Sequence, residues 1–185
     1  MRATLLLTSL ALLTATTHAQ DAAPLDIKGF RLGMPQAEAV AKGGLECSRL
    51  AGTTRTFCSK SWRSRNEAVD TVAGVPTTYF HVGILPDETV GSIYVTFAAD
   101  QFDKVRQALA SKYPTLQCKN SIVQNRAGAS FDQVDCDMAQ NGHTLLLEKR
   151  SSKVDISSIN LISAAQFKEL QESEAARKEK AKKDI

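Results

Sequence analysis

The chain has 185 residues, of which 43% are hydrophobic and 23% are charged, and its formal net charge is +3 at pH 7. This composition excludes a wholly disordered chain and a coiled coil, and the length fits one domain or two small lobes that share a core. The net charge is too small to indicate a nucleic acid or an anionic membrane surface as the partner.

Residues 1–19 have the pattern of a secretory signal peptide. Arg2 supplies the positive charge, Leu5–Leu13 form a short apolar stretch, and small residues precede the expected cleavage after Ala19. The apolar stretch is too short to anchor the chain in a bilayer. Gln20 follows the cleavage position, where a lipoprotein would have a cysteine. We therefore expect an exported, periplasmic protein without a membrane anchor.

Four cysteines lie outside the signal: Cys47, Cys58, Cys118 and Cys136. An even number of cysteines in an exported chain indicates disulfides, because oxidising compartments keep thiols paired. Four cysteines allow three connectivities. We favour Cys47–Cys58 and Cys118–Cys136, because each pair brackets one predicted hairpin. The chain has no C-x-x-C pair, and only His81 and His143 follow the signal, so we expect no bound metal and no cofactor.

The first half of the mature chain predicts a short strand, a helix and two hairpins. In chain order, these are a strand over 26–32, a helix over 36–42, a hairpin over 45–50 and 54–60, a polar loop over 59–75, and strands over 76–85 and 91–98. Pro35 suits the first turn of the helix, and the glycines at 43 and 44 suit its end. In the last strand, apolar and polar residues alternate as in a half-buried strand.

The second half predicts a helix followed by more strands. Phe102, Val105, Leu109 and Tyr113 repeat at helical spacing. A meander over 116–124, 130–138 and 143–150 follows, in which Asn141-Gly142 is the best hairpin signal of the chain. A final strand covers 155–163.

The C-terminal tail predicts a helix with little apolar surface. Ser163 and Gln166 have the spacing of a capping box. Only Phe167 and Leu170 give this helix an apolar face, and the remainder is almost entirely charge and alanine. We expect the tail to be helical, exposed and solubilising.

The predicted class is therefore α+β, with antiparallel sheet and helices packed on one face. We expect two similar αβ lobes, over 20–98 and 99–163, because each half runs helix, cysteine, turn, cysteine and further strands. Residues 164–185 form the exposed helical tail.

The run Ile27–Met34, followed by a helix and Cys47, resembles the start of the tandem αβ-repeat envelope proteins. That group includes the β-lactamase inhibitory protein and small outer-membrane-assembly lipoproteins. The resemblance implies repeats in which helices pack on a four-stranded antiparallel sheet, each with its own disulfide. The second half, over 97–113 and from Gly128 onward, resembles uncharacterised bacterial periplasmic proteins. No inhibitory contact residue of the group falls on a matching position here.

No catalytic constellation is present in the sequence. The chain lacks G-x-S-x-G, H-E-x-x-H and a glycine-rich phosphate loop. His81 lies in a predicted strand and His143 follows a hairpin turn, and we assign both to structural roles. Asp132, Asp135 and Asp137 could indicate acid–base chemistry or a cation site. However, Asp135 and Asp137 alternate with apolar residues, which indicates the solvated face of a strand. We therefore expect no enzymatic activity.

The most suggestive surface in the sequence is the segment 60–65. Trp62, the one tryptophan, lies beside Arg63 and Arg65, and these residue types are enriched in protein–protein hot spots. The alternative is that Trp62 closes the edge of the core while the arginines are solvated.

We therefore expect a non-enzymatic protein that acts through contact with a protein partner in the cell envelope. Inhibition of a hydrolase is one concrete form, which rests on analogy of fold. An accessory factor for envelope assembly or stress is the alternative. An enzyme of unrecognised type is a third, weaker candidate.

Overall fold

The computed structural model describes residues 24–49, 55–60, 70–125 and 127–183. The first half contains β1 (Asp26–Ile27), β2 (Phe30–Arg31), α1 (Gln36–Gly43), β3 (Leu45–Arg49), β4 (Thr56–Lys60), β5 (Thr71–Val72), β6 (Val75–Ile84) and β7 (Val90–Ala98). The second half contains a 3₁₀ turn (Ala99–Gln101), α3 (Phe102–Lys112), β8 (Gln117–Gln124), β9 (Ser130–Gln140), β10 (His143–Glu148), β11 (Ile156–Ile162) and α4 (Ala164–Lys183).

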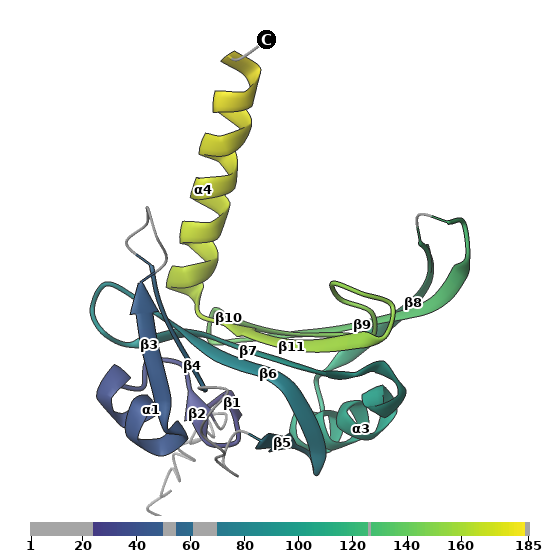
Figure 1. Ribbon diagram of the computed structural model, residues 1–185, viewed down its shortest axis with the longest axis horizontal. Helices are drawn as coiled ribbons and strands as arrows, with labels where there is room; N and C mark the ends of the chain where they lie inside the picture. Colours follow the sequence, from purple (N-terminus) through teal and green to yellow (C-terminus); the bar gives the residue numbers. More distant parts are fainter. Residues whose placement is uncertain (1–23, 50–54, 61–69, 126, 184–185) are drawn as a thin grey trace, which may run out of the picture.

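One antiparallel sheet forms the centre of this α+β structure. Its described strands lie in the order β3-β4-β6-β7-β11-β10-β9-β8, and β5 pairs with β6 outside this path. Helices α1 and α3 lie on one face of the sheet, while α4 projects from the opposite side (Figure 1). The α+β class, the antiparallel sheet and the C-terminal helix were all predicted.

The two halves of the chain contribute equivalent parts to this sheet. After α1 the path runs through β3, β4, β6 and β7, and after α3 it runs through β8, β9, β10 and β11. The last strands of the halves, β7 and β11, pair antiparallel at the middle. Because the sheet is continuous across this junction, the division into two lobes at residue 98 remains a prediction.

The face of the sheet that α1 and α3 cover is the apolar one. Ile93 and Val95 of β7 are fully buried, whereas Tyr94 between them is only half-buried. Because successive side chains of a strand point to opposite faces, the buried residues point toward the helices and Tyr94 points away. Phe102 and Val105 of α3 belong to the same core.

The end of α3 is joined to β1 by a cluster of polar contacts. The Tyr113 hydroxyl accepts a hydrogen bond from the Asp26 N–H and donates one to the Asp26 carbonyl, both at 2.9 Å. The Lys112 ammonium lies 2.6 Å from the Asp26 carboxylate. Burial works to lower the pKa of Lys112, but the hydrogen bonds to Asp26 and Tyr113 outweigh it and raise that pKa.

The prediction of one strand over 26–32 was wrong. Those residues form a tight hairpin, in which β1 pairs with β2. The physical reason is the turn at Lys28 and Gly29, whose φ angles of 57° and 76° lie in the left-handed region. The Gly29 N–H also donates to the Asp26 carboxylate at 2.8 Å, which is a common way to stabilise such a turn.

Candidate functional site on the open face of the sheet

The four cysteines form the predicted disulfides. Cys47 joins Cys58 and Cys118 joins Cys136. Each bridge links directly opposed residues of two neighbouring strands, β3 with β4 and β8 with β9. Both outer margins of the sheet are thus cross-linked at equivalent places in the two halves. Two such bridges indicate an oxidising, exported environment.

The predicted interface residues Trp62, Arg63 and Arg65 lie outside the described residues. They follow Lys60, the last residue of β4. The hypothesis that they contact a partner therefore stays a prediction from the sequence.

His143 has a structural contact, as expected. Its Nδ1 accepts a hydrogen bond from the Ala164 N–H at 3.3 Å. Ala164 is the first residue of α4, and the first N–H groups of a helix have no partner within it. His143 therefore satisfies one of the unpaired donors at the start of α4.

The face of the sheet opposite α1 and α3, here called the open face, carries a group of ring side chains. This aromatic cluster consists of Phe57 from β4, Tyr79 and His81 from β6, and Tyr94 from β7. The ring of His81 lies 5.4 Å from that of Phe57 and 5.2 Å from those of Tyr79 and Tyr94. Tyr79 is 49% exposed. The cluster therefore presents aromatic surface to solvent on a face without α1 or α3.

His81, at the centre of the aromatic cluster, is held in its neutral form. Its Nδ1 is buried and has no hydrogen-bond partner in the described part of the chain. Burial lowers the pKa of His81 to about 4. At pH 7 the side chain therefore adds no positive charge to the open face, and it packs among the rings as an uncharged heterocycle.

A small notch separates the aromatic cluster from the first turns of α4. Its volume is about 220 Å³, below the roughly 300 Å³ at which pockets for drug-sized ligands begin. A single large side chain fits a hollow of this size better than a free ligand does. The notch is lined by Arg55, Phe57, His81, Ser92, Tyr94, Asn160, Ile162, Gln166 and Leu170.

Contacts at its first turns hold α4 against the open face. The Ser163 N–H donates to the Gly91 carbonyl at 2.8 Å, and the Gln166 N–H donates to the Ser163 hydroxyl at 3.1 Å. Glu169 forms an ion pair with Arg55 at 3.0 Å. Half of the predicted capping box is thus present, because the Ser163 N–H, which would donate to the Gln166 side chain in a complete box, donates to Gly91 instead.

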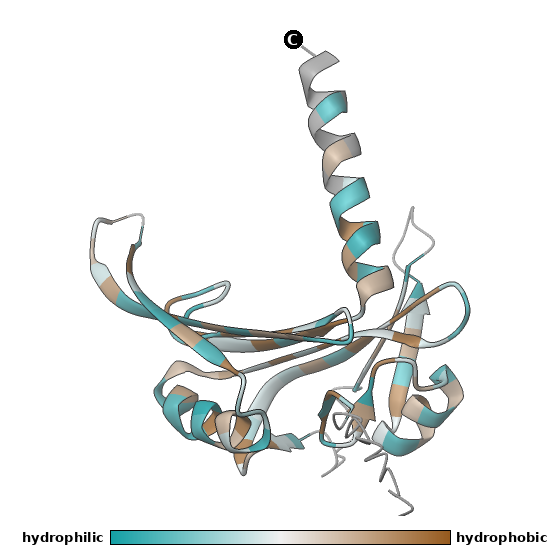
Figure 2. Ribbon diagram, turned by 180° about the vertical axis from the view of Figure 1, so that it is seen from behind, coloured by the Kyte–Doolittle hydropathy of each residue, from teal (hydrophilic) through white to brown (hydrophobic). Residues whose placement is uncertain are grey.

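Gly91 lets the chain come close enough for these contacts. A Cβ at Gly91 would lie 2.6 Å from Cγ of Leu85 and 3.1 Å from the Gln166 side chain. Those distances leave no room for a larger residue without movement of Leu85. Beyond this junction, Phe167 and Leu170 are 42% and 37% exposed. Apolar residues of α4 therefore adjoin the aromatic cluster; Figure 2 shows brown segments at the base of α4.

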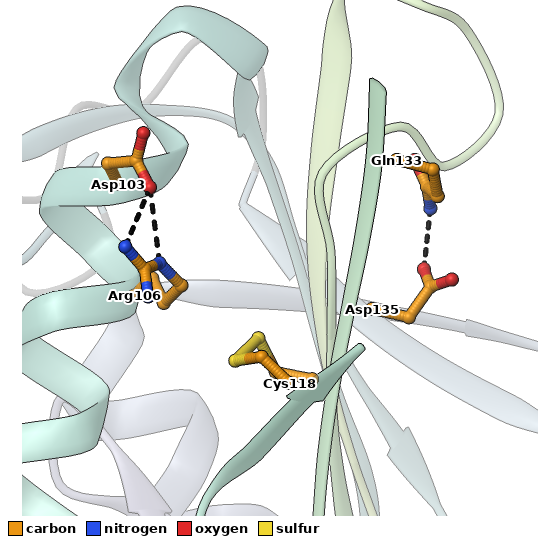
Figure 3. Close-up of a disulfide and its surroundings, with 6 residues drawn as sticks. Asp103, Arg106, Cys118, Gln133 and Asp135 are labelled. Carbon is orange, nitrogen blue, oxygen red and sulfur yellow. Dashed lines mark hydrogen bonds and ion pairs between the residues drawn. A yellow bond between two sulfur atoms is a disulfide. The ribbon is translucent and has the colours of Figure 1, made fainter. Parts of the chain in front are cut away.

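The other side of the open face, on β9, is acidic. Asp135 and Asp137 are exposed, as predicted. Gln133, expected on the same solvated face, is only 5% exposed, because its amide donates to Asp135 at 2.5 Å and to the Arg150 carbonyl at 3.4 Å. Figure 3 shows the Gln133 amide directed toward the Asp135 carboxylate.

A second hollow lies on the opposite face, between α3 and the strands β8 and β9. Its volume is about 550 Å³. Asp103 and Arg106 form an ion pair at 3.0 Å beside the disulfide of Cys118 (Figure 3). Asp132 and Lys149 also line it. Charges of both signs and few apolar atoms make this hollow a solvated groove, so the open face is the stronger candidate.

Two further searches concern the described ranges only. No three His, Cys, Asp or Glu side chains within them lie close enough together to hold a metal ion. None of their helices is both long and apolar enough to cross a membrane.

No protein-family model matches the chain, and no curated protein matches it significantly. Its function therefore has to be inferred from the chemistry of the open face.

Proposed function

We propose that this chain is a periplasmic protein that acts without catalysis, by binding another protein through the open face of its sheet. The observation that carries the proposal is the aromatic cluster beside the base of α4. There the exposed ring of Tyr79 packs against His81, and His81 lines, together with the exposed Leu170, a notch that suits one side chain. Aromatic residues around such a hollow are typical of protein–protein hot spots.

The proposed compartment rests on the sequence and on the disulfides. Residues 1–19 have the pattern of a cleaved signal peptide, and Gln20 excludes the lipid-bearing cysteine of a lipoprotein at that position. The two disulfides fit an oxidising compartment. A periplasmic location agrees with both features.

A two-lobe organisation is part of the proposal. Each half has one helix followed by four strands in the main path of the sheet, with a disulfide between the first two strands. This equivalence supports an internal duplication over 20–98 and 99–163. It also agrees with the resemblance to tandem αβ-repeat envelope proteins.

A non-catalytic role is supported by the contacts of the two histidines. A general base needs a nucleophile or substrate proton within hydrogen-bond reach. In the described residues, His81 contacts rings and His143 contacts a backbone N–H. These surroundings favour packing and capping roles over acid–base catalysis.

Inhibition of a hydrolase is the concrete form of binding that we favour, and it rests on the analogy of fold. An accessory role in envelope assembly or stress is the second candidate. The two differ in a measurable way. An inhibitor lowers the activity of its purified target at stoichiometric ratio, whereas an accessory factor binds envelope components and inhibits no hydrolase.

A site-specific photo-cross-linker tests the proposed surface. Placed at Tyr79, it should capture one envelope protein from native periplasm, identified by mass spectrometry. The same probe at Gln107, an exposed position of α3 on the other face, is the matched control and should not capture it. A Trp62→Ala variant tests whether the segment 60–65 extends the contact surface. We expect this variant to fold and to capture the partner more weakly.

The purified partner then decides between the two candidates. Direct binding that Tyr79→Ala weakens at least tenfold would support the open face as the contact surface. Equal binding by Tyr79→Ala and wild type, or capture from Gln107 alone, would contradict it. Loss of the partner's hydrolase activity at one equivalent would identify an inhibitor, and unchanged activity an accessory factor.

A further inference from the structure

In the described part of the chain, strand β8 ends the sheet and its outer edge pairs with no other strand. It pairs with β9 on one side and is the last strand of the path through the sheet. Seven of its eight residues are exposed, and the remaining one, Val123, is half-buried. Ile122 is 63% exposed. Backbone N–H and C=O groups along such an edge are available to another strand. Figure 1 shows β8 and β9 at the free margin of the sheet.

The edge of β8 has few of the features that usually prevent strand pairing. Along Gln117–Gln124 it has one charged residue, Lys119, and no proline. The opposite edge differs. Strand β3 has five residues, carries the exposed charges of Glu46 and Arg49, and contacts α1. A chain with one open and one protected edge associates in pairs and does not extend into a filament.

The residue pattern of β8 suits pairing with its own copy. Two copies related by a two-fold axis normal to the sheet would have both open faces on the same side. If the axis passes beside Asn120 or beside Ser121, nearly all of β8 pairs with β8 of the second copy, and each of these two positions defines one register. In the register centred on Asn120, Lys119 lies opposite Ser121 of the other copy. In the register centred on Ser121, Lys119 lies opposite Val123 of the other copy. Neither register opposes two like charges, which would be destabilising. Both also place the exposed Ile122 opposite a neutral residue.

We propose that β8 pairs antiparallel with β8 of a second copy of this chain, giving a two-fold dimer with one continuous sheet. The contact is an edge, separate from the aromatic cluster, so the dimer leaves both open faces accessible. Because one edge strand buries less area than a standard interface, the dissociation constant should be on the order of 10 to 100 µM.

Sedimentation velocity of the mature, disulfide-bonded protein tests this proposal. Between about 1 µM and about 1 mM, the wild type should pass from monomer to dimer and stop there. Ser121→Lys places two lysines opposite each other in both registers, so it should raise the dissociation constant about tenfold or more. The matched control is Ser48→Lys, the same change at the edge of β3, which should leave dimerisation unchanged.

A second variant distinguishes the two registers. Ser121→Glu places a carboxylate opposite Lys119 in the register centred on Asn120, which should tighten the dimer. In the register centred on Ser121 it opposes two carboxylates, which should weaken the dimer. Near-UV circular dichroism and the unfolding midpoint must match those of the wild type, so that a changed affinity does not reflect unfolding.

Other outcomes would overturn the proposal. A wild type that stays monomeric at the highest concentration removes it. The proposal is also wrong if Ser121→Lys and Ser121→Glu leave the dissociation constant unchanged, or if Ser48→Lys raises it as much as Ser121→Lys does. A dimer lost in Tyr79→Ala would be formed by the open face instead. That last result would leave the proposed partner surface testable while rejecting the edge contact.

Discussion

At the scale of single residues, His81 shows how the fold determines chemistry that a histidine does not have by itself. In the sequence it is one polar residue in a predicted strand. In the structure three rings surround it, its buried Nδ1 has no hydrogen-bond partner among the described residues, and its pKa falls from 6.5 to about 4. The unfolded chain therefore binds a proton at this residue in a pH range where the folded chain does not.

We predict that stability falls as the pH is lowered from about 6.5 to about 4. In this window the unfolded state holds more protons at His81 than the folded state, so the free energy of unfolding decreases with decreasing pH. The shift from 6.5 to about 4 corresponds to a loss of roughly 3 kcal/mol. Urea unfolding at a series of pH values measures it, and an NMR titration of the imidazole gives the pKa directly.

His81→Phe keeps a ring in the aromatic cluster and removes the titrating group. Its free energy of unfolding should therefore vary less than that of the wild type between pH 6.5 and 4. Parallel curves for wild type and His81→Phe would show that His81 does not control acid sensitivity.

At the scale of elements, the start of α4 depends on one hydroxyl. The Gln166 N–H donates to Ser163, and Ser163 is buried at the junction with the sheet. Ser163→Ala should destabilise the first turn of α4 by about 1 kcal/mol, because it leaves that N–H without its cap. Amide hydrogen exchange over residues 164–167 should rise accordingly.

Ser173→Ala is the matched control in the same helix. Its hydroxyl donates to the Leu170 carbonyl within α4, an arrangement that adds little to helix stability. Exchange at the first turn should be unchanged in this variant. Equal acceleration in both variants would mean that α4 frays as a whole and that the Ser163 cap does not fix its start.

The elements that local sequence determines were largely predictable. Asn141-Gly142 has φ angles of 53° and 76°, and the hairpin between β9 and β10 forms where the turn signal indicated. Helix α1 also lies close to its predicted bounds, and α3 contains Phe102, Val105 and Leu109 of the predicted helical repeat. These features depend on residues that are neighbours in the chain, so periodicity and turn chemistry suffice to locate them.

The candidate site was less predictable because it depends on strand pairing. Tyr79 and His81 alternate visibly within one strand, but Phe57 and Tyr94 come from others. They meet His81 only through the pairing of β4, β6 and β7. The burial of Gln133 likewise requires the Arg150 carbonyl, which β10 brings near it. No pattern within one segment contains such contacts.

At the scale of the whole molecule, the two disulfides should contribute unequally to stability. The bridge between Cys118 and Cys136 closes a separation of 18 residues, and that between Cys47 and Cys58 closes 11. In the loop-entropy model each contributes about 3 kcal/mol, and the longer loop contributes a few tenths more. Replacing each pair by alanine and measuring urea unfolding gives both values.

The contribution of the loops can be separated from that of packing in these variants. Cys58 and Cys136 are both almost fully buried, so replacement by alanine costs comparable packing at each bridge. A loss below about 1 kcal/mol for either pair would show that the bridge does little to restrict the unfolded chain.

The position of β11 has a consequence for how the chain is made. Ile156–Ile162 is synthesised after all the other described strands, yet it lies in the middle of the sheet between β7 and β10. Until it is available, β7 and β10 have no partner on that side, and the two half-sheets have no link through the centre. A nascent chain on the ribosome therefore cannot complete this sheet until residues 156–162 have been made. Until that point the unpaired edges of β7 and β10 stay open to other strands.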